Sequence, residues 1–137
     1  MISVTDLAQF ASARLGDAKI LLAADRFDGA VYLCGYAVEI ALKARICKTL
    51  NWAEFPETRG EFRNLESFRT HDLDVLLRLS GLEPAFKQQH FAVWNLLAVW
   101  KVETRYNAVG TASQDHTSAM VSSADTFLAA RGTSHDR

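Results

Sequence analysis

The sequence predicts an all-α fold, an up-and-down antiparallel helical bundle of four longer helices plus one short helix. Three observations predict it: apolar residues recur at spacings of three and four along most of the chain, one long segment is apolar almost all the way round, and no segment shows sustained strand alternation. With 137 residues, 49% of them hydrophobic and 23% charged, the chain is expected to form one domain over residues 1–131, followed by a frayed polar tail at 132–137.

The first helix is predicted to run from Thr5 to Ala24. Thr5 has the side chain of an N-cap, and the charge of Asp6 favours the positive end of the helix dipole. The inward face is an apolar stripe at spacings of four and three: Leu7, Ala11, Leu15, Ala18 and Leu22. Asp28 and Gly29 then supply turn chemistry at the junction with the next helix.

The second helix is predicted at Phe27–Leu50 and is the most informative segment, because a helix that is apolar all round is normally a buried central helix. It carries a narrow polar stripe whose side chains fall within about 60° of one another at 100° per residue. The stripe consists of Tyr32, Tyr36, Glu39 and Lys43. An unpaired buried charge is costly, so Glu39 and Lys43 are expected to pair, at the favourable i,i+4 spacing, or to open onto a site. A structural network and a functional site both remain open at this point.

Residues 51–69 are predicted to form a loop that packs onto the helices. Pro56 and Gly60 punctuate the segment, while apolar anchors are spread through it. The anchors are Trp52, Phe55, Phe62, Leu65 and Phe68. Arginine and glutamate alternate in the same segment, which is typical of a solvated surface.

A short helix follows, with Thr70 as its predicted cap and Gly81 as its stop. His71 lies at the start of this helix and is a candidate site residue, although it could simply help to cap the chain or pack against Phe68. The other histidines are predicted to be a core or interface residue, His90, and two exposed residues, His116 and His135.

The next helix is predicted from Pro84 to Trp100, because proline suits a first helical position and one buried face follows at spacings of four and three. That face consists of Phe86, His90, Val93, Leu97 and Trp100. Residues 101–113 are predicted as a turn region that ends at Ser113, the N-cap of the last helix. Met120, Ala124, Phe127 and Leu128 recur on one side of the last helix.

Arg105 and Tyr106 form a second candidate cluster in that turn region. They could reach the neighbourhood of Glu39, and the planar guanidinium of arginine suits a carboxylate or a phosphate. The alternative is an arginine–carboxylate bridge that ties the turn to the second helix. Spacing alone does not separate the two.

The absent patterns disfavour several function classes. The sequence has no HExxH or paired-cysteine motif, no glycine-rich phosphate loop and no GxSxG, so neither a metal nor a cofactor is expected. The net charge of −1 gives no global field to attract nucleic acid. Cys34 and Cys47 would lie about 20 Å apart on one helix, too far for a disulfide, which fits a reducing compartment. With no signal-peptide pattern and no long uncharged stretch, a cytoplasmic location without membrane contact is expected.

Three segments, in this order, resemble the HEPN domain family. They are AVYLCGYAVEIALKARI, THDLDVLL and W-x4-RY, and the resemblance covers roughly Thr5 to Arg131. It implies an up-and-down helical bundle that is usually a homodimer. It also implies one of two roles: partner of a small nucleotidyltransferase, as in toxin–antitoxin pairs, or metal-independent ribonuclease with an R-x4–6-H motif near the last helix.

The ribonuclease motif is absent from this chain. The first histidine after Arg105 is His116, eleven residues on, so the residue that would act on the ribose 2′-hydroxyl is missing. The favoured expectation is therefore a non-catalytic interaction and nucleotide-binding module that dimerises and partners a small nucleotidyltransferase. The alternatives are a ribonuclease with an altered site, using Arg105 with His71 or His116, and a helical scaffold without a ligand site.

The favoured expectation places a nucleotide or RNA contact along the polar stripe and the turn cluster. The candidate ligand-binding residues are Tyr32, Tyr36, Glu39, Lys43, His71, Arg105 and Tyr106.

Overall fold

A computed structural model describes the backbone of residues 1–135 and the side chains of residues 1–130. Its elements in chain order are β1 (Ile2–Ser3), α1 (Val4–Ala23), α2 (Phe27–Leu50), β2 (Glu54–Phe55), η1 (Glu66–Phe68), α3 (Leu73–Ser80), α4 (Glu83–Gln89), α5 (Phe91–Ala98), η2 (Val102–Tyr106) and α6 (Gln114–His135). The predicted all-α class is confirmed apart from two strands of two residues each. Within the described part of the chain, no helix combines the length and the apolarity needed to cross a membrane.

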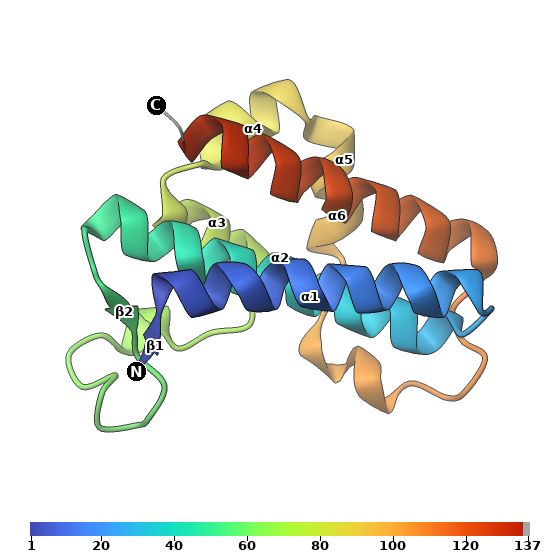
Figure 1. The fold of residues 1–137 in the computed structure, drawn as a ribbon, viewed down its shortest axis with the longest axis horizontal. Coiled ribbons are helices and arrows are strands. Elements are labelled where there is room, and N and C mark those ends of the chain that lie inside the picture. Colours follow the sequence, from blue (N-terminus) through green and yellow to red (C-terminus); the bar gives the residue numbers. More distant parts are fainter. Residues whose placement is uncertain (136–137) are drawn as a thin grey trace.

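Helix α2 is the centre of the fold. Helices α1 and α2 form an antiparallel hairpin, and α6 packs on both while running in the same general direction as α2 (Figure 1). Helix α3 and the 3-10 helix η2 also contact α2. The strands β1 and β2 pair antiparallel and gather, with residues 51–69, at the end of the hairpin where α1 begins (Figure 1).

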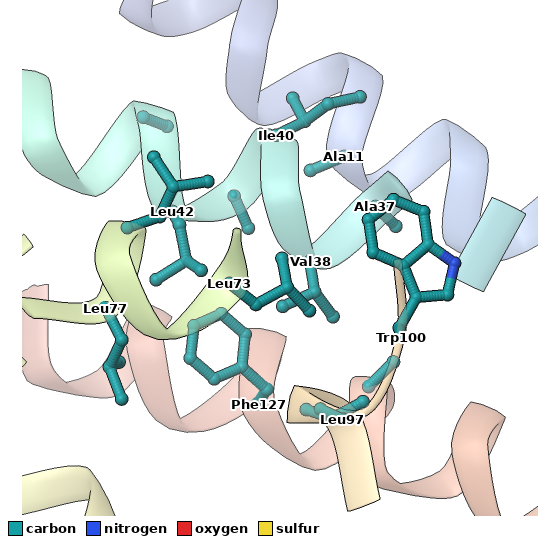
Figure 2. Packing of buried hydrophobic residues seen from close by; sticks show 14 of the residues in the cluster. Ala11, Ala37, Val38, Ile40, Leu42, Leu73, Leu77, Leu97, Trp100 and Phe127 are labelled. Atoms are coloured by element: carbon teal, nitrogen blue, oxygen red, sulfur yellow. The ribbon is translucent and has the colours of Figure 1, made fainter. Parts of the chain in front are cut away.

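The bounds of α2 are those that the sequence predicts, Phe27–Leu50. Asn51 ends the helix in the left-handed conformation, with φ 60°. Buried residues cover most of the circumference, as an all-round apolar helix requires. Figure 2 shows Val38 and Leu42 directed toward Leu73 of α3 and Phe127 of α6, so α2 supplies the shared core of three helices.

Gly35 is the point of closest approach to α2. A Cβ atom at this position would lie 2.2 Å from the indole of Trp100, a separation that real side chains do not reach. Trp100 is 4% exposed and lies directly on the helix backbone beside Ala37 (Figure 2). Glycine is therefore required here for packing and not for a special φ angle.

Helix α1 begins one residue earlier than predicted. Ser3, and not Thr5, is the N-cap, because its Oγ accepts a hydrogen bond from the Asp6 amide at 3.1 Å. The predicted inward face is confirmed: Leu7, Ala11, Leu15 and Ala18 are buried, and Leu22 packs against the core.

Residues 51–69 pack onto the body, as predicted. Phe55 and Phe62 are buried, with their ring centroids 6.0 Å apart. Trp52 covers them from the side and lies 5.0 Å from the Phe68 ring. This aromatic cluster fixes the segment, including η1, against the start of α1 and the last turns of α2.

Helix α3 is capped two residues later than the sequence predicts. Asp72, and not Thr70, is the N-cap, and its carboxylate accepts from the amides of Asp74 and Val75. Thr70 instead accepts from the Asp72 amide and shapes the approach to the helix. Gly81 ends the helix with φ 80°, as predicted.

The predicted helix from Pro84 to Trp100 is two short helices, so the arrangement of four longer helices plus one short helix is corrected to three long and three short helices among the described residues. His90 breaks the segment with a non-helical φ of −136° and ψ of 47°. The break turns α5 so that Trp94, and not Val93, is buried, and the Trp94 indole donates to Asp74 at 2.8 Å. His90 itself is half-buried and packs on the Phe86 ring at 4.9 Å.

Ser113 caps α6, as predicted, by accepting from the His116 amide. The predicted inward face of α6 is largely confirmed, since Met120, Ala124 and Phe127 are buried. Its backbone continues to His135, past the end predicted at residue 131, so residues 132–135 extend the helix instead of forming a frayed tail. Residues 136–137 and the side chain of His135 lie outside the described part.

Candidate functional site

Glu39 is the most constrained member of the predicted polar stripe. Its side chain is 1% exposed, although it sits on the central helix among apolar residues. One carboxylate oxygen, Oε2, accepts from the Lys43 ammonium at 2.9 Å and lies 3.0 Å from Nδ1 of His71. The other oxygen, Oε1, is buried and has no hydrogen-bond partner among the described residues. The predicted ion pair is therefore confirmed, and His71 is its third member.

His71 joins this network from the segment that precedes α3. Its side chain is 57% exposed, whereas the carboxylate that it contacts is buried. When Nδ1 carries the proton and donates it to Glu39, the second ring nitrogen, Nε2, is left as an acceptor. A buried carboxylate behind a histidine fixes the tautomer and orientation of the ring, which is the usual arrangement where the outer nitrogen has a chemical task.

The network borders a groove of about 400 Å³ that we call the Lys43 groove. Helix α2 supplies Tyr36 and Lys43, α1 supplies Phe10, and the segment before α3 supplies Arg69 and His71. The remaining lining residues are Ile2, Leu7, Ile40, Phe55, Pro56, Glu57, Phe62 and Thr70. One groove therefore holds two cations, a histidine and exposed aromatic edges, a combination that suits an anionic group attached to a flat ring.

The charges in the Lys43 groove differ in how strongly they are held. The Lys43 ammonium is paired with Glu39 and also lies 5.5 Å from the centroid of the Phe55 ring. Arg69 forms no ion pair within the described residues, so its guanidinium is the free cation of the groove. Burial, and then the negative charge of Glu39, raise the pKa of Tyr36, so its phenol stays neutral at physiological pH and offers both a donor and a ring face.

A second groove, of about 430 Å³, lies on the other side of His71 and extends toward η2. Asp72, Asp74 and Glu103 line it, against a single cation, Lys101. An anion is therefore disfavoured there, and the Lys43 groove is the better candidate for a phosphate or a carboxylate.

The other end of the stripe is held differently. Tyr32 stacks on Tyr36 with ring centroids 6.2 Å apart and planes 8° apart, and it also approaches Trp100 at 6.2 Å. Hydrogen bonding to Tyr32, and then to Tyr106, raises the pKa of the Arg105 guanidinium, which lies 4.9 Å from the Tyr106 ring. Arg105 and Tyr106 are exposed and are not among the residues that line the Lys43 groove.

The predicted candidates are thus divided between two places. Glu39, Lys43, His71 and Tyr36 meet at the Lys43 groove, whereas Arg105 contacts Tyr32 and Tyr106 outside the groove. Arg69 and Phe10, which are not among the residues predicted from the sequence, also line the groove. Arg69 directly precedes Thr70 and His71 in the chain, and this adjacency is the one sequence signal that points to it. Phe10 lies outside the inward stripe of α1 and gives no such signal.

Comparisons of this chain with models of protein families, with curated proteins and with solved structures found no match. The resemblance to HEPN domains therefore stays a prediction.

Proposed function

We propose that this chain is a non-catalytic nucleotide-binding module of the HEPN type, which forms a homodimer and acts with a small nucleotidyltransferase. One observation carries the nucleotide-binding part: Lys43, Arg69 and His71 gather on one groove beside the rings of Tyr36 and Phe10. The cations suit a phosphate, and the rings suit a base. The volume of about 400 Å³ lies near the lower end for small-molecule sites, which favours a mononucleotide over a larger ligand.

The homodimer and the nucleotidyltransferase partner rest on the resemblance alone. The absence of the R-x4–6-H motif favours this role over that of a nuclease. Co-purification of the tagged chain with any small nucleotidyltransferase encoded beside it tests the partner. Size-exclusion chromatography with light scattering tests the dimer. A monomer that captures no such enzyme would contradict both.

Calorimetric titration of the protein with AMP tests the nucleotide site. We expect Arg69→Gln to weaken binding about tenfold, because the groove then loses its free cation. Arg63→Gln is the matched control, since Arg63 is exposed in the same segment but does not line the groove. Equal affinity in both variants, or no heat with AMP in the wild type, would contradict the proposal. No ligand response, together with full stability, would support a plain helical scaffold.

A second candidate function is a ribonuclease with an altered site, and the Glu39–His71 contact favours it. His71 leaves one ring nitrogen free at an exposed position beside Lys43 and Arg69, the positions of a general base and of phosphate-binding cations. The test is cleavage of a fluorescent RNA by wild-type protein, His71→Ala and Arg105→Ala. Loss of cleavage in His71→Ala alone would favour this candidate, and equal background in all three would remove it.

A further inference from the structure

His71 borders two grooves at once, the Lys43 groove and the second groove that extends toward η2. Its Nδ1 lies 3.0 Å from Oε2 of Glu39, a carboxylate that is 1% exposed, whereas the His71 side chain is 57% exposed. The two nitrogens point to different sides of an imidazole ring, so a hydrogen bond from Nδ1 to the buried carboxylate leaves Nε2 on the exposed side. His71 can therefore offer a ligand either a lone pair or, when it carries a second proton, a charged N–H group.

The charged and titratable groups that face His71 come from several parts of the chain. They are Tyr36, Glu39 and Lys43 of α2, Glu57 after β2, Arg69, Asp72 and Asp74 around the start of α3, and Lys101 and Glu103 at η2. Among these groups and His71 itself, only the histidine is of a type that ordinarily changes its charge near neutral pH. A ligand that needs more positive charge than the groove holds can therefore recruit it at His71.

The charges of the Lys43 groove leave a single uncompensated cation. The Lys43 ammonium is matched by the Glu39 carboxylate at 2.9 Å, and Glu57 pairs with the amino group of Met1 at 3.1 Å. The Arg69 guanidinium then has no acidic partner among the described residues. One positive charge matches a monoanion, but it compensates only half of a dianion.

Phosphate esters differ in this respect. A phosphodiester carries one negative charge on two free oxygens, whereas a terminal phosphate monoester carries about −1.5 to −2 at pH 7 on three acceptor oxygens. A protonated His71 supplies the missing charge and a further donor, because Nε2–H can bind the phosphate while Nδ1–H stays on Glu39. The buried Glu39 charge behind the ring favours the same protonated form. The groove is therefore matched to a terminal monoester once His71 has taken up a proton.

We infer that the Lys43 groove selects nucleotides with a terminal phosphate monoester and binds them together with one proton, which His71 takes up between Glu39 and the phosphate. This inference rests on the proposed function, since it concerns the same groove and names its ligand class more narrowly. The proton comes from the solvent, and no covalent bond forms between the ligand and the protein. Cyclic nucleotides and internal phosphodiesters are disfavoured, because Arg69 alone already balances their charge.

The experiment is calorimetric titration with AMP and, in parallel, with 3′,5′-cyclic AMP. A proton drawn from the buffer adds the ionisation enthalpy of that buffer to the measured heat, so the AMP heat at pH 7.5 should differ between Tris and HEPES. The affinity for AMP should fall about three- to tenfold from pH 7 to pH 8, because proton uptake becomes harder as the pH rises. Cyclic AMP should bind at least about tenfold more weakly than AMP at pH 7, with no dependence on buffer or pH.

Two variants assign the proton to one histidine. His71→Asn keeps an amide that can hydrogen-bond Glu39 but cannot take up a proton, so the dependence on buffer and pH should vanish and AMP should bind about as weakly as cyclic AMP. His116→Asn is the matched control, because His116 is exposed and does not line the Lys43 groove, and it should behave like the wild type.

The outcomes separate this inference from the proposed function. AMP binding without proton uptake, or uptake that persists in His71→Asn, would overturn the inference and leave the nucleotide site in place. Equal affinities for AMP and cyclic AMP in the wild type would overturn the selection of a monoester. No heat with AMP in any buffer would overturn the nucleotide site, and the inference with it.

Discussion

The polar stripe on α2 has charged groups near both of its ends, and their environments are opposite. One end is Glu39 with Lys43, and the other is Tyr32, which Arg105 of η2 contacts. At one end, Glu39 is 1% exposed and its carboxylate is bound by Lys43 and His71. Near the other end, Arg105 of η2 is an exposed cation that contacts the side chains of Tyr32 and Tyr106. The first is a buried carboxylate held by two partners at the edge of the Lys43 groove, and the second is a cation at the surface.

This difference shows at which end of the stripe a lost contact lowers the free energy of unfolding. A carboxylate taken out of water has to recover its lost hydration from specific partners, whereas an exposed guanidinium keeps its hydration. The Glu39 end is therefore sensitive to every partner that is removed. The Arg105 end should be nearly neutral for stability, and any effect of changing it should show in binding.

The largest expected effect comes from breaking the junction between the two ends, at Gly35. Gly35→Ala would place Cβ 2.2 Å from the Trp100 indole, so Trp100 has to leave its site above the helix. We expect a loss of about 3 kcal/mol or more in the free energy of unfolding, since the displaced indole leaves a cavity or strains the backbone. Urea unfolding followed by circular dichroism measures it.

Gly16→Ala is the matched control, because a Cβ at Gly16 meets nothing within 4 Å. Alanine in the interior of α1 should stabilise the protein by about 0.5–1 kcal/mol, through the lower flexibility of the unfolded chain. If both variants had the same stability, the close packing of Trp100 on Gly35 would be refuted.

The second effect separates the two ends directly. Lys43→Met leaves the buried Glu39 carboxylate with His71 alone, and we expect a loss of about 1–3 kcal/mol, reduced from the value for a fully buried pair because Lys43 is 19% exposed. Arg105→Met removes an exposed cation and should leave the free energy of unfolding nearly unchanged. Thermal and urea unfolding of both variants would show the contrast.

The double variant Glu39→Gln with Lys43→Met tests the cause. It removes the buried charge together with its partner, so it should be more stable than Lys43→Met alone. A double variant that loses the sum of the two single effects would mean that Glu39 and Lys43 are not coupled.

The sequence predicts the Glu39 end much better than the Arg105 end. The all-round apolar pattern of Phe27–Leu50 is enough to place a central helix, and the i,i+4 spacing is enough to predict the pair of Glu39 with Lys43. Contacts within one helix follow from its fixed geometry. The bond from Glu39 to His71 spans 32 residues, and no local pattern encodes it.

Tertiary packing also explains the elements that the sequence misplaces. The helical period of residues 84–100 hides the break at His90, which accompanies the burial of Trp94 and the bond of its indole to Asp74. In the same way, the helical periodicity does not show that Arg105 contacts Tyr32 and lies outside the groove beside Glu39. Local sequence sets the helices, whereas the site depends on how loops return to α2.

The third effect is a pH dependence of stability. It comes from Asp28, whose carboxylate binds the turn before α6 to the start of α2; we call these hydrogen bonds the tether. Hydrogen bonds from the amides of Gly110 and then Ala112 to the ionised carboxylate lower the pKa of Asp28. A carboxyl with a lowered pKa in the folded state stabilises the protein above its unfolded-state pKa, and this contribution is lost as the pH falls through the folded-state value. We therefore expect Asp28→Asn to be less stable than wild type at pH 7, with the difference shrinking below about pH 4.

Urea unfolding at several pH values measures this convergence. Glu61 is the internal reference, because hydrogen bonding from the Glu57 amide is the main reason that its pKa is about 2, and its share of the acid sensitivity should persist in Asp28→Asn. A constant difference between the two proteins from pH 7 down to strong acid would contradict the tether.

The smallest expected effect is slow alkylation of the two cysteines, Cys34 in the first half of α2 and Cys47 in its last turns. Burial raises the pKa of Cys34 to about 12 and that of Cys47 to about 11, and the Cys34 thiol also donates to the Met120 carbonyl at 3.3 Å. A thiolate is needed for alkylation, so in the folded protein both should resist iodoacetamide near neutral pH and react only through local opening. Mass spectrometry should find Cys47 labelled first, because it lies in the last turns of α2 while Cys34 is covered by α6. Labelling of Cys34 first would contradict this order of local opening along α2.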